Sequence, residues 1–298
     1  MSGAGESYTS GNIPPDDRGL EGLQVVHAGL PVEMIMTPRP FFSCRLDETC
    51  RGVKERNAER YSFLPVMNGE RVLGLLDARP FFDAAAPDVT VEKHYHPLSE
   101  QMLIGADASI WQFLRTADQV ETRLVVKGHS VAGLVTLSDL HKLPVRTALF
   151  AALTNLEVCM TTLIGERLSY DGANWLEHLA AKRRDLLASQ EKRARANDEF
   201  INRLLLTQFC DKREIIAKAS LVDLPPDQLR QDLKEAERLR NYVAHSNDFA
   251  QDDLMAHEVC KTARSIEGLI MLMQRKIAFH IGKNSKPLLH QGKRGIAQ

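Results

Sequence analysis

The sequence predicts an α+β fold for the N-terminal part of the chain and an all-α helical bundle for the C-terminal part. Between about residues 23 and 143, short β-like runs alternate with short amphipathic helices. After Pro144, glycine becomes sparse and apolar residues recur at spacings of three and four, which is the helical period. The N-terminal part also repeats itself after about 60 residues. We therefore expect the domain boundary near residues 143–146.

The two ends of the chain carry little that a core would bury. Residues 1–22 are rich in Gly, Ser, Pro and Asp, which predicts a disordered tail, and we expect a flexible tail at 283–298. A chain of 298 residues suits about two domains. Its 44% hydrophobic and 26% charged residues are typical of a soluble globular protein.

Charge and cysteine usage limit the possible functions. The formal net charge is −1, so the chain has no global basic field and any nucleic-acid contact must be local. Five cysteines lack CxxC or metal-ligand spacing, which indicates a reducing compartment and argues against a disulfide framework or a zinc site. We see no apolar run of about 18 residues and no signal peptide, and we therefore expect a cytoplasmic protein.

The internal repeat can be followed residue by residue. The segment SFLPVMNGERVLGLLDARPF (62–81) lies over TRLVVKGHSVAGLVTLSDL (122–140), and both predict strand, turn, strand and helix start. Upstream, FFSCRLDETCRGV (41–53) lies over MLIGADASIWQFL (102–114), each with a short strand, an Asp, and a Thr or Ser that opens a helix. This predicts two β-α-β-β-α type repeats.

The repeat resembles a tandem pair of CBS domains, the Bateman module. The resemblance covers the first copy at about 30–83 and the second at about 97–143. Its most specific piece is GLVTLSDL (133–140), and IMTP (35–38) is similar to the usual opening of the first copy. The resemblance implies a signal-transduction role in which an adenine nucleotide (AMP, ADP or ATP) is a regulatory ligand.

Thr136 and Asp139 are the candidate nucleotide-binding residues. A helix that starts where the strand ends offers free N–H groups, and with the Thr136 hydroxyl these can hold a phosphate. Asp139, one turn further on, can accept two hydrogen bonds from a ribose diol. The family uses its Thr and Asp in these roles. The alternative is that Ser/Thr-x-x-Asp is only a helix N-cap. Arg123 and Lys127 are further candidate phosphate partners.

The first copy departs from this pattern. Asp77 stands where Thr136 lies and Pro80 where Asp139 lies. An Asp repels phosphate and a Pro cannot hold a ribose, so we expect one nucleotide site, with wall residues from the first copy. His94 and His96 have no third ligand in sequence and are interpreted as part of a linker, and no metal is expected.

The helical part is expected at 145–282, with helices near 145–168, 174–196, 198–218, 226–244 and 252–280. Arg240 lies beside the apolar stripe of the fourth helix, and His245 follows its end, where residues 246–248 should break the helix. The segment LRNYVAH (239–245) resembles the Arg-x4-6-His motif of HEPN domains, with Asn241 as the polar residue after the Arg.

That second resemblance implies a metal-independent endoribonuclease. His245 would move protons at the ribose 2′-OH or the leaving oxygen, Arg240 would stabilise the charged phosphorane, and Asn241 would orient the phosphate. Family sites are composite, which implies a homodimer acting on single-stranded RNA. The alternative is a non-enzymatic adaptor whose helical domain dimerises or docks a partner, with Arg240 paired to an acid such as Glu237 or Glu157.

A basic helix at 181–197 offers two interpretations. It carries Arg183, Arg184, Lys192, Arg193 and Arg195. These side chains are either a solvated face or a track for RNA phosphates. Taken together, the sequence predicts a cytoplasmic sensor in which a nucleotide-binding pair controls a ribonuclease, with no membrane partner.

Overall fold

The computed structural model describes residues 26, 29–82, 88–169, 173–197, 202–245, 249–250 and 252–284. The predicted tail at 1–22, most of the tail at 283–298 and the predicted helix break at 246–248 lie outside the described residues. The chain forms two compact units. A mixed unit contains residues 25–150 and 242–264, and a helical unit contains 151–241 together with 265 onward.

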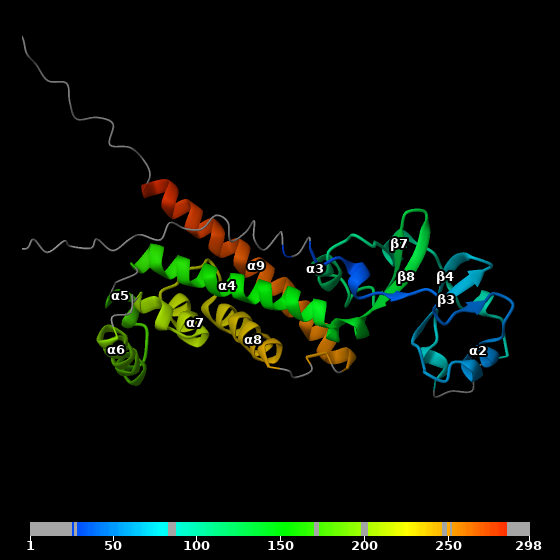
Figure 1. Cartoon of the computed structure of the whole chain (residues 1–298), viewed down its shortest axis with the longest axis horizontal. Coiled ribbons are helices and arrows are strands. Elements are labelled where there is room, and N and C mark those ends of the chain that lie inside the picture. The colour runs from blue at the N-terminus through cyan, green and yellow to red at the C-terminus, as the bar shows by residue number, and fades with distance from the viewer. Residues whose placement is uncertain are drawn as a thin grey trace, which may run out of the picture. The chain divides into compact units, whose positions relative to one another are not determined.

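The mixed unit holds two four-stranded sheets (Figure 1). The first sheet has the order β2-β3-β4-β5, with β2 (Cys44–Arg45), β3 (Phe63–Asn68), β4 (Arg71–Asp77) and β5 (His96–Pro97). The second has the order β1-β8-β7-β6, with β1 (Thr37–Pro38), β6 (Leu103–Gly105), β7 (Thr122–Lys127) and β8 (Ser130–Thr136).

The internal repeat of the sequence is a repeat of the structure. In each copy a short strand pairs in parallel with the first strand of a hairpin, β2 with β3 and β6 with β7. Each hairpin has its register shift at the same place, between Val66 and Met67 and between Val125 and Val126. Thr49 and Ser109 each accept a backbone N–H as N-caps of α2 (Cys50–Arg56) and α3 (Ile110–Leu114), as the sequence predicts.

The second sheet is completed by β1, a strand from the opening segment of the first copy. Thr37 and Pro38 pair antiparallel with Leu134 and Gly133. Gly133 is required there, because a Cβ on it would lie 2.5 Å from the carbonyl oxygen of Thr37. At the equivalent place in the first sheet, a Cβ on Gly74 would lie 2.0 Å from the carbonyl oxygen of His96. Two glycines thus let the outer strands approach.

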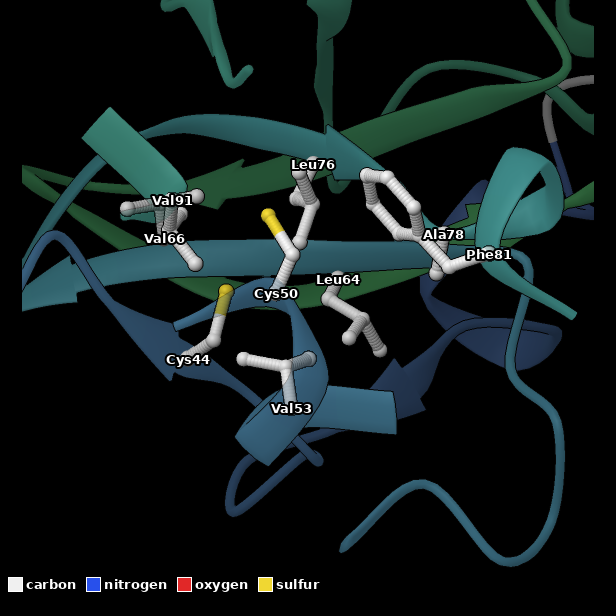
Figure 2. Close-up of a cluster of buried hydrophobic side chains, with 9 residues drawn as sticks. All are labelled: Cys44, Cys50, Val53, Leu64, Val66, Leu76, Ala78, Phe81 and Val91. Carbon is white, nitrogen blue, oxygen red and sulfur yellow. The ribbon is translucent and has the colours of Figure 1, made fainter. Parts of the chain in front are cut away.

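The first copy has its own apolar core. Figure 2 shows this core, whose buried side chains are Cys44, Cys50, Val53, Leu64, Val66, Leu76, Ala78, Phe81 and Val91. A second buried cluster joins β4 to β7 through Val72, Leu75 and Leu124. Full burial of one such Val or Leu side chain contributes about 1.5–3 kcal/mol. The two sheets therefore share apolar packing.

Short 3-10 helices connect these elements. They are η1 (Val32–Met34), η2 (Arg79–Phe81), η3 (Val91–Lys93), η4 (Glu100–Met102) and η5 (Leu137–His141). The α-helices that follow are α4 (Leu143–Leu168), α5 (Ala173–Leu176), α6 (Ala181–Ala196), α7 (Phe209–Lys218), α8 (Pro226–Ala244) and α9 (Asp253–Asn284), with η6 (Arg203–Leu206) before α7.

Two of the predicted helices are interrupted. The helix expected at 174–196 is broken between α5 and α6, where Lys218 donates to the carbonyl of His178 at 2.9 Å and so satisfies an acceptor left by the break. The helix expected at 198–218 becomes η6 and α7 over its described residues. Gln208 and Asp211 form a capping box there, which starts a new helix.

Helix α4 corrects the expectation that no segment has membrane-spanning length. By length and composition alone it is long and apolar enough, with a mean hydropathy of 1.5 over its best window. Of that window, 61% is buried inside the protein, as in the core helix of a soluble protein.

Candidate functional site

A cavity of about 440 Å³ lies in the mixed unit and contains both predicted nucleotide residues, Thr136 and Asp139. This volume falls within the usual range for small-molecule sites, about 300–1,000 Å³. Its walls come from the start of the second copy's η5, from β7 and β8, from the segment before β2, and from residues 59–63 of the first copy. The aromatic lining residues are Phe41, Phe42, Tyr61 and Phe63.

The capping box at the start of η5 holds Asp139 in place. The Thr136 N–H donates to Asp139 Oδ2 at 2.6 Å, and the Thr136 hydroxyl lies 3.3 Å from the same oxygen. Lys142 Nζ lies 2.6 Å from Asp139 Oδ1 and also donates to the carbonyl of Ile35. The Asp139 side chain is only 8% exposed. The motif therefore does form a helix N-cap, as the alternative interpretation of the sequence predicted.

The Asp139 carboxylate has enough hydrogen-bond acceptor sites both to cap η5 and to bind a nucleotide. An ionised carboxylate has about four lone-pair sites. Thr136 and Lys142 together use three of these, which leaves Oδ1 able to accept a further hydrogen bond. A ribose hydroxyl in the cavity can take that position.

The backbone N–H groups expected to cradle a phosphate are largely engaged. The Thr136 N–H binds Asp139, and the Leu137 N–H donates to the carbonyl of Glu121 at 3.0 Å. The backbone N–H of Asp139 is taken by the Thr136 side chain in the capping box. The expectation of several free donors at this helix start was therefore wrong, because the cap and the neighbouring strand use them.

The two further phosphate candidates lie elsewhere. Arg123 donates to Thr116 Oγ1 at 2.8 Å, and burial lowers the pKa of its guanidinium. Lys127 forms an exposed ion pair with Glu33 at 2.7 Å. Neither residue lines the cavity. The structure therefore does not bring Arg123 or Lys127 together with Thr136 and Asp139.

The first copy's departure from the motif has a structural counterpart. Asp77 pairs across the hairpin with Phe63 as Thr136 pairs with Thr122, so Asp77 and Thr136 are equivalent positions. Arg79 binds the Asp77 carboxylate through Nη2 at 2.8 Å and through Nε at 3.0 Å. Burial raises the pKa of Asp77, but the hydrogen bonds from Arg79 outweigh it and the net shift is downward.

Arg79 also reaches the cavity wall. Its Nη1 lies 2.7 Å from Glu121 Oε2, and its guanidinium lies 4.5 Å from the centre of the Phe63 ring. Glu121 and Phe63 both line the cavity. The first copy thus has an internal ion pair where the second has its candidate site, and that ion pair supports two lining residues.

Several lining residues had no signal in the sequence motifs. Glu59, Arg60 and Tyr61 precede β3, and only the general expectation of wall residues from the first copy covered them. Asp253, the first residue of α9, lies more than a hundred positions from the other lining residues. Sequence spacing alone gives no means of finding it.

A larger hollow of about 930 Å³ lies beside β2 and the β3–β4 turn. Its lining includes Arg39, Arg45 and Glu70 but none of the predicted site residues. Among the described residues, no three His, Cys, Asp or Glu side chains come together as a metal site would require.

Within the helical unit, Arg240 of α8 lies beside the buried stripe of Leu233, Ala236 and Leu239. Its side chain is 41% exposed, and its Nε lies 3.5 Å from Glu157 Oε2. Glu157 is held more closely by the buried Lys212, at 3.0 Å. Arg240 thus takes part in an ion pair that is long and partly solvated.

Asn241 of the helical unit is exposed. His245, in the mixed unit, is also exposed and follows the last residue of α8. Its carbonyl accepts a hydrogen bond from Arg146 Nη1 at 2.7 Å, and the same nitrogen caps the carbonyls of Tyr242 and Val243. The guanidinium of Arg146 lies 5.0 Å from the centre of the Phe249 ring, so the backbone at His245 is well held.

Some basic side chains of helix α6 form ion pairs, and others are exposed. Arg183 binds Asp211 at 2.6 Å and Arg195 binds Glu191 at 2.7 Å. The other basic side chains of this helix are exposed to solvent: Lys182, Arg184, Lys192 and Arg193.

No family model matches the chain, and no curated protein is similar enough to count as a relative. Several of the similar solved structures are CBS domains. One, from a bacterial CNNM/CorC family Mg²⁺ transporter in complex with ATP, has 24% identity and a TM-score of 0.33, covering 43% of this chain and 94% of that chain.

Two others are of the same kind. The putative acetoin utilization protein AcuB from Vibrio cholerae has 18% identity, covers 37% of this chain and 87% of that one, and gives a TM-score of 0.32. The CBS domains of a transcriptional regulator from Streptococcus pneumoniae have 24% sequence identity to this chain and a TM-score of 0.31. The match covers 37% of this chain and 96% of that chain. Each likeness covers less than half of this chain with a TM-score below 0.5, so the site rests on this chain's own geometry.

Proposed function

We propose that this protein is a nucleotide-sensing regulatory protein whose CBS-like pair binds one adenine nucleotide in the 440 Å³ cavity. The observation that carries the proposal is the composition of that cavity. Four aromatic side chains line the cavity. Phe41, Phe42 and Phe63 each have an arginine guanidinium over the ring, whereas Tyr61 is 49% exposed and can stack on a base. Asp139 offers a carboxylate oxygen to a ribose. A purine and a ribose thus find matching partners in one cavity.

Isothermal titration calorimetry of the full chain with AMP, ADP and ATP tests this proposal. We expect one nucleotide per chain, because the first copy has Asp77 and Arg79 paired where the second has its site. Bound ligand should also raise the melting temperature, since it binds only the folded chain. Absence of binding at millimolar concentration of all three nucleotides would refute the proposal.

A variant of the cavity wall sharpens the test. Tyr61 is 49% exposed, so replacing its side chain costs little packing beyond its contact with the Phe42 ring, whose centre lies 5.8 Å from that of Tyr61. Stacking of a base on an aromatic side chain contributes about 1–3 kcal/mol, so Tyr61→Ala should weaken binding about 5- to 150-fold. The matched control is Phe279→Ala, an exposed aromatic that does not line the cavity, which should leave the affinity unchanged.

The finer proposal is that the nucleotide controls a metal-independent ribonuclease site built from Arg240, Asn241 and His245 of two chains. It is supported by the exposure of all three side chains, since a guanidinium that is 41% exposed with one 3.5 Å ion pair can still meet a phosphate. The rival is a non-enzymatic adaptor in which the Arg240–Glu157 ion pair is structural and the helical part dimerises or docks a partner.

Cleavage of single-stranded RNA in the presence of EDTA separates these two functions. The ribonuclease proposal requires cyclic phosphate ends and activity that depends on the dimer. Arg238→Ala is the matched control, because Arg238 is an exposed arginine on the same helix. If no RNA is cleaved with or without nucleotide, the adaptor is the function that remains.

A further inference from the structure

The charges that line the nucleotide cavity are unusual for a site that would receive a polyphosphate. Four carboxylates line it, those of Glu59, Glu121, Asp139 and Asp253. Of the lining residues in the described part of the chain, one is basic, Arg60. Its guanidinium lies 4.8 Å from the centre of the Phe82 ring, which is outside the cavity. The lining therefore carries more negative than positive charge.

Two of these carboxylates are neutralised and two are not. Glu121 is paired with Arg79 at 2.7 Å, and Asp139 is paired with Lys142 at 2.6 Å. Within the described residues, the Glu59 and Asp253 side chains have no ion pair. The negative charges of these two carboxylates therefore repel an anionic ligand in the cavity.

Backbone donors do not compensate for this charge. The N–H groups of Thr136, Leu137 and Asp139 are already hydrogen-bonded within the protein. The N-terminus of α9, which carries the positive end of the helix dipole, is capped by the protein itself. There the Asp252 carboxylate accepts a hydrogen bond from the Met255 N–H at 2.8 Å. The Thr136 hydroxyl already donates to Asp139 Oδ2 at 3.3 Å. Among the described lining residues, the donors that can meet a phosphate are therefore the N–H and hydroxyl of Ser138 and the one basic side chain, Arg60, which suffice for one phosphate group at most.

We propose that the first turn of α9 forms part of the nucleotide cavity and that Asp253 makes the site selective for adenosine or adenosine monophosphate over the di- and triphosphate. This inference rests on the proposed function of the cavity and narrows its ligand class. Asp253 is a specificity-determining residue in this account. Because it lies on α9, the ligand also touches a segment far outside the CBS-like repeats.

The size of the effect follows from Coulomb's law. Two unit charges 6 Å apart in a medium close to water repel by an amount that changes a binding constant about threefold, and up to tenfold where the dielectric constant is lower. ATP carries about two more charges than AMP, so the unpaired carboxylates should favour AMP over ATP by about tenfold or more. Removing the charge of Asp253 should narrow that preference by about three- to tenfold.

The experiment is calorimetry on the full chain with adenosine, AMP, ADP and ATP, without magnesium, for the wild type and Asp253→Asn. We expect AMP to bind tighter than ATP in the wild type, and Asp253→Asn to improve ATP binding while adenosine binding stays unchanged. The matched control is Glu258→Gln, which removes an exposed charge from the same helix away from the cavity and should leave the AMP-to-ATP ratio unchanged. Raising the salt concentration should also reduce the ratio, because exposed charges are screened.

The failures of the two proposals are distinguishable. If ATP binds as tightly as AMP or tighter, or if Asp253→Asn and Glu258→Gln change the ratio equally, the selectivity inference is overturned while nucleotide sensing stands. If none of the four compounds binds, nucleotide sensing fails and the inference fails with it.

Discussion

Asp139 has two roles in this account, and one pair of substitutions separates them. Its carboxylate caps η5 through Thr136 and pairs with Lys142, and it also faces the cavity. Asp139→Ala removes both roles. Asp139→Asn keeps an oxygen that can accept the Thr136 N–H but removes the charge. Comparing the two variants therefore shows how much of the residue's contribution belongs to the fold.

The expected magnitudes follow from the contacts. Loss of an N-cap costs about 0.5–2 kcal/mol, and loss of a charge-assisted hydrogen bond about 1.5–3 kcal/mol. Lys142 is 33% exposed and keeps the Ile35 carbonyl, so water compensates part of its loss. We expect Asp139→Ala to lower the free energy of unfolding by about 2–4 kcal/mol and Asp139→Asn by about 1 kcal/mol.

Urea denaturation followed by circular dichroism measures these values, and calorimetry with AMP measures the binding role. In both variants AMP affinity should fall by about 1.5–3 kcal/mol, roughly 10- to 150-fold, if Asp139 holds the ribose. Asp107→Ala, an exposed Asp outside the cavity, is the control and should change stability by less than about 0.5 kcal/mol. If Asp139→Ala were as stable as the wild type, the capping account would be refuted. Unchanged AMP affinity in Asp139→Asn would refute the ribose contact.

Three further predictions concern other parts of the chain. Gly133→Ala should destabilise the fold by about 1–3 kcal/mol, seen as a lower urea midpoint, because its Cβ would meet the β1 backbone at 2.5 Å. The hydrogen bonds from Arg264 hold the pKa of Asp118 below its usual value of about 3.9, so the pair stabilises the fold above that pH and the stabilisation is lost as pH falls through the lowered pKa. Urea midpoints of the wild type and Asp118→Asn should therefore differ at pH 6 and converge as the pH falls below the lowered pKa of Asp118. A difference that stays the same over the whole acid range contradicts the pairing. If the helical part is the proposed ribonuclease, Arg240→Ala and His245→Ala should each lower RNA cleavage about 100-fold or more, with little change in the urea midpoint because the Arg240 side chain is 41% exposed and His245 is exposed.

The repeat was predictable because its signals are local. A Thr or Ser before an apolar run predicts an N-cap, and Thr49 and Ser109 are both caps. Glycine at the hairpin turns predicts positive φ, and Gly69 and Gly128 have φ of 56° and 63°. These patterns depend on a few neighbouring residues, and tertiary contacts did not override them.

The site was predictable only in part, for physical reasons. Thr136 and Asp139 were proposed from the motif GLVTLSDL at one helix start, and both line the cavity. Spacing alone could not separate their mutual hydrogen bonds from a ligand role. Arg123 and Lys127 were chosen for charge, and their actual partners, Thr116 and Glu33, follow from tertiary structure. The α5–α6 break likewise depends on a distant donor, Lys218, that periodicity does not show.

The central claim is that one adenine nucleotide occupies the cavity beside Asp139. A crystal structure of the full chain soaked with AMP and, separately, with ATP tests it most directly. We predict one AMP per chain, with its base against the aromatic wall that includes Tyr61 and Phe63 and a ribose hydroxyl within hydrogen-bonding distance of Asp139 Oδ1. For ATP at the same concentration we predict weaker or no density. AMP bound beside Asp77 and Arg79, or a cavity that stays empty at saturating AMP, would contradict the account.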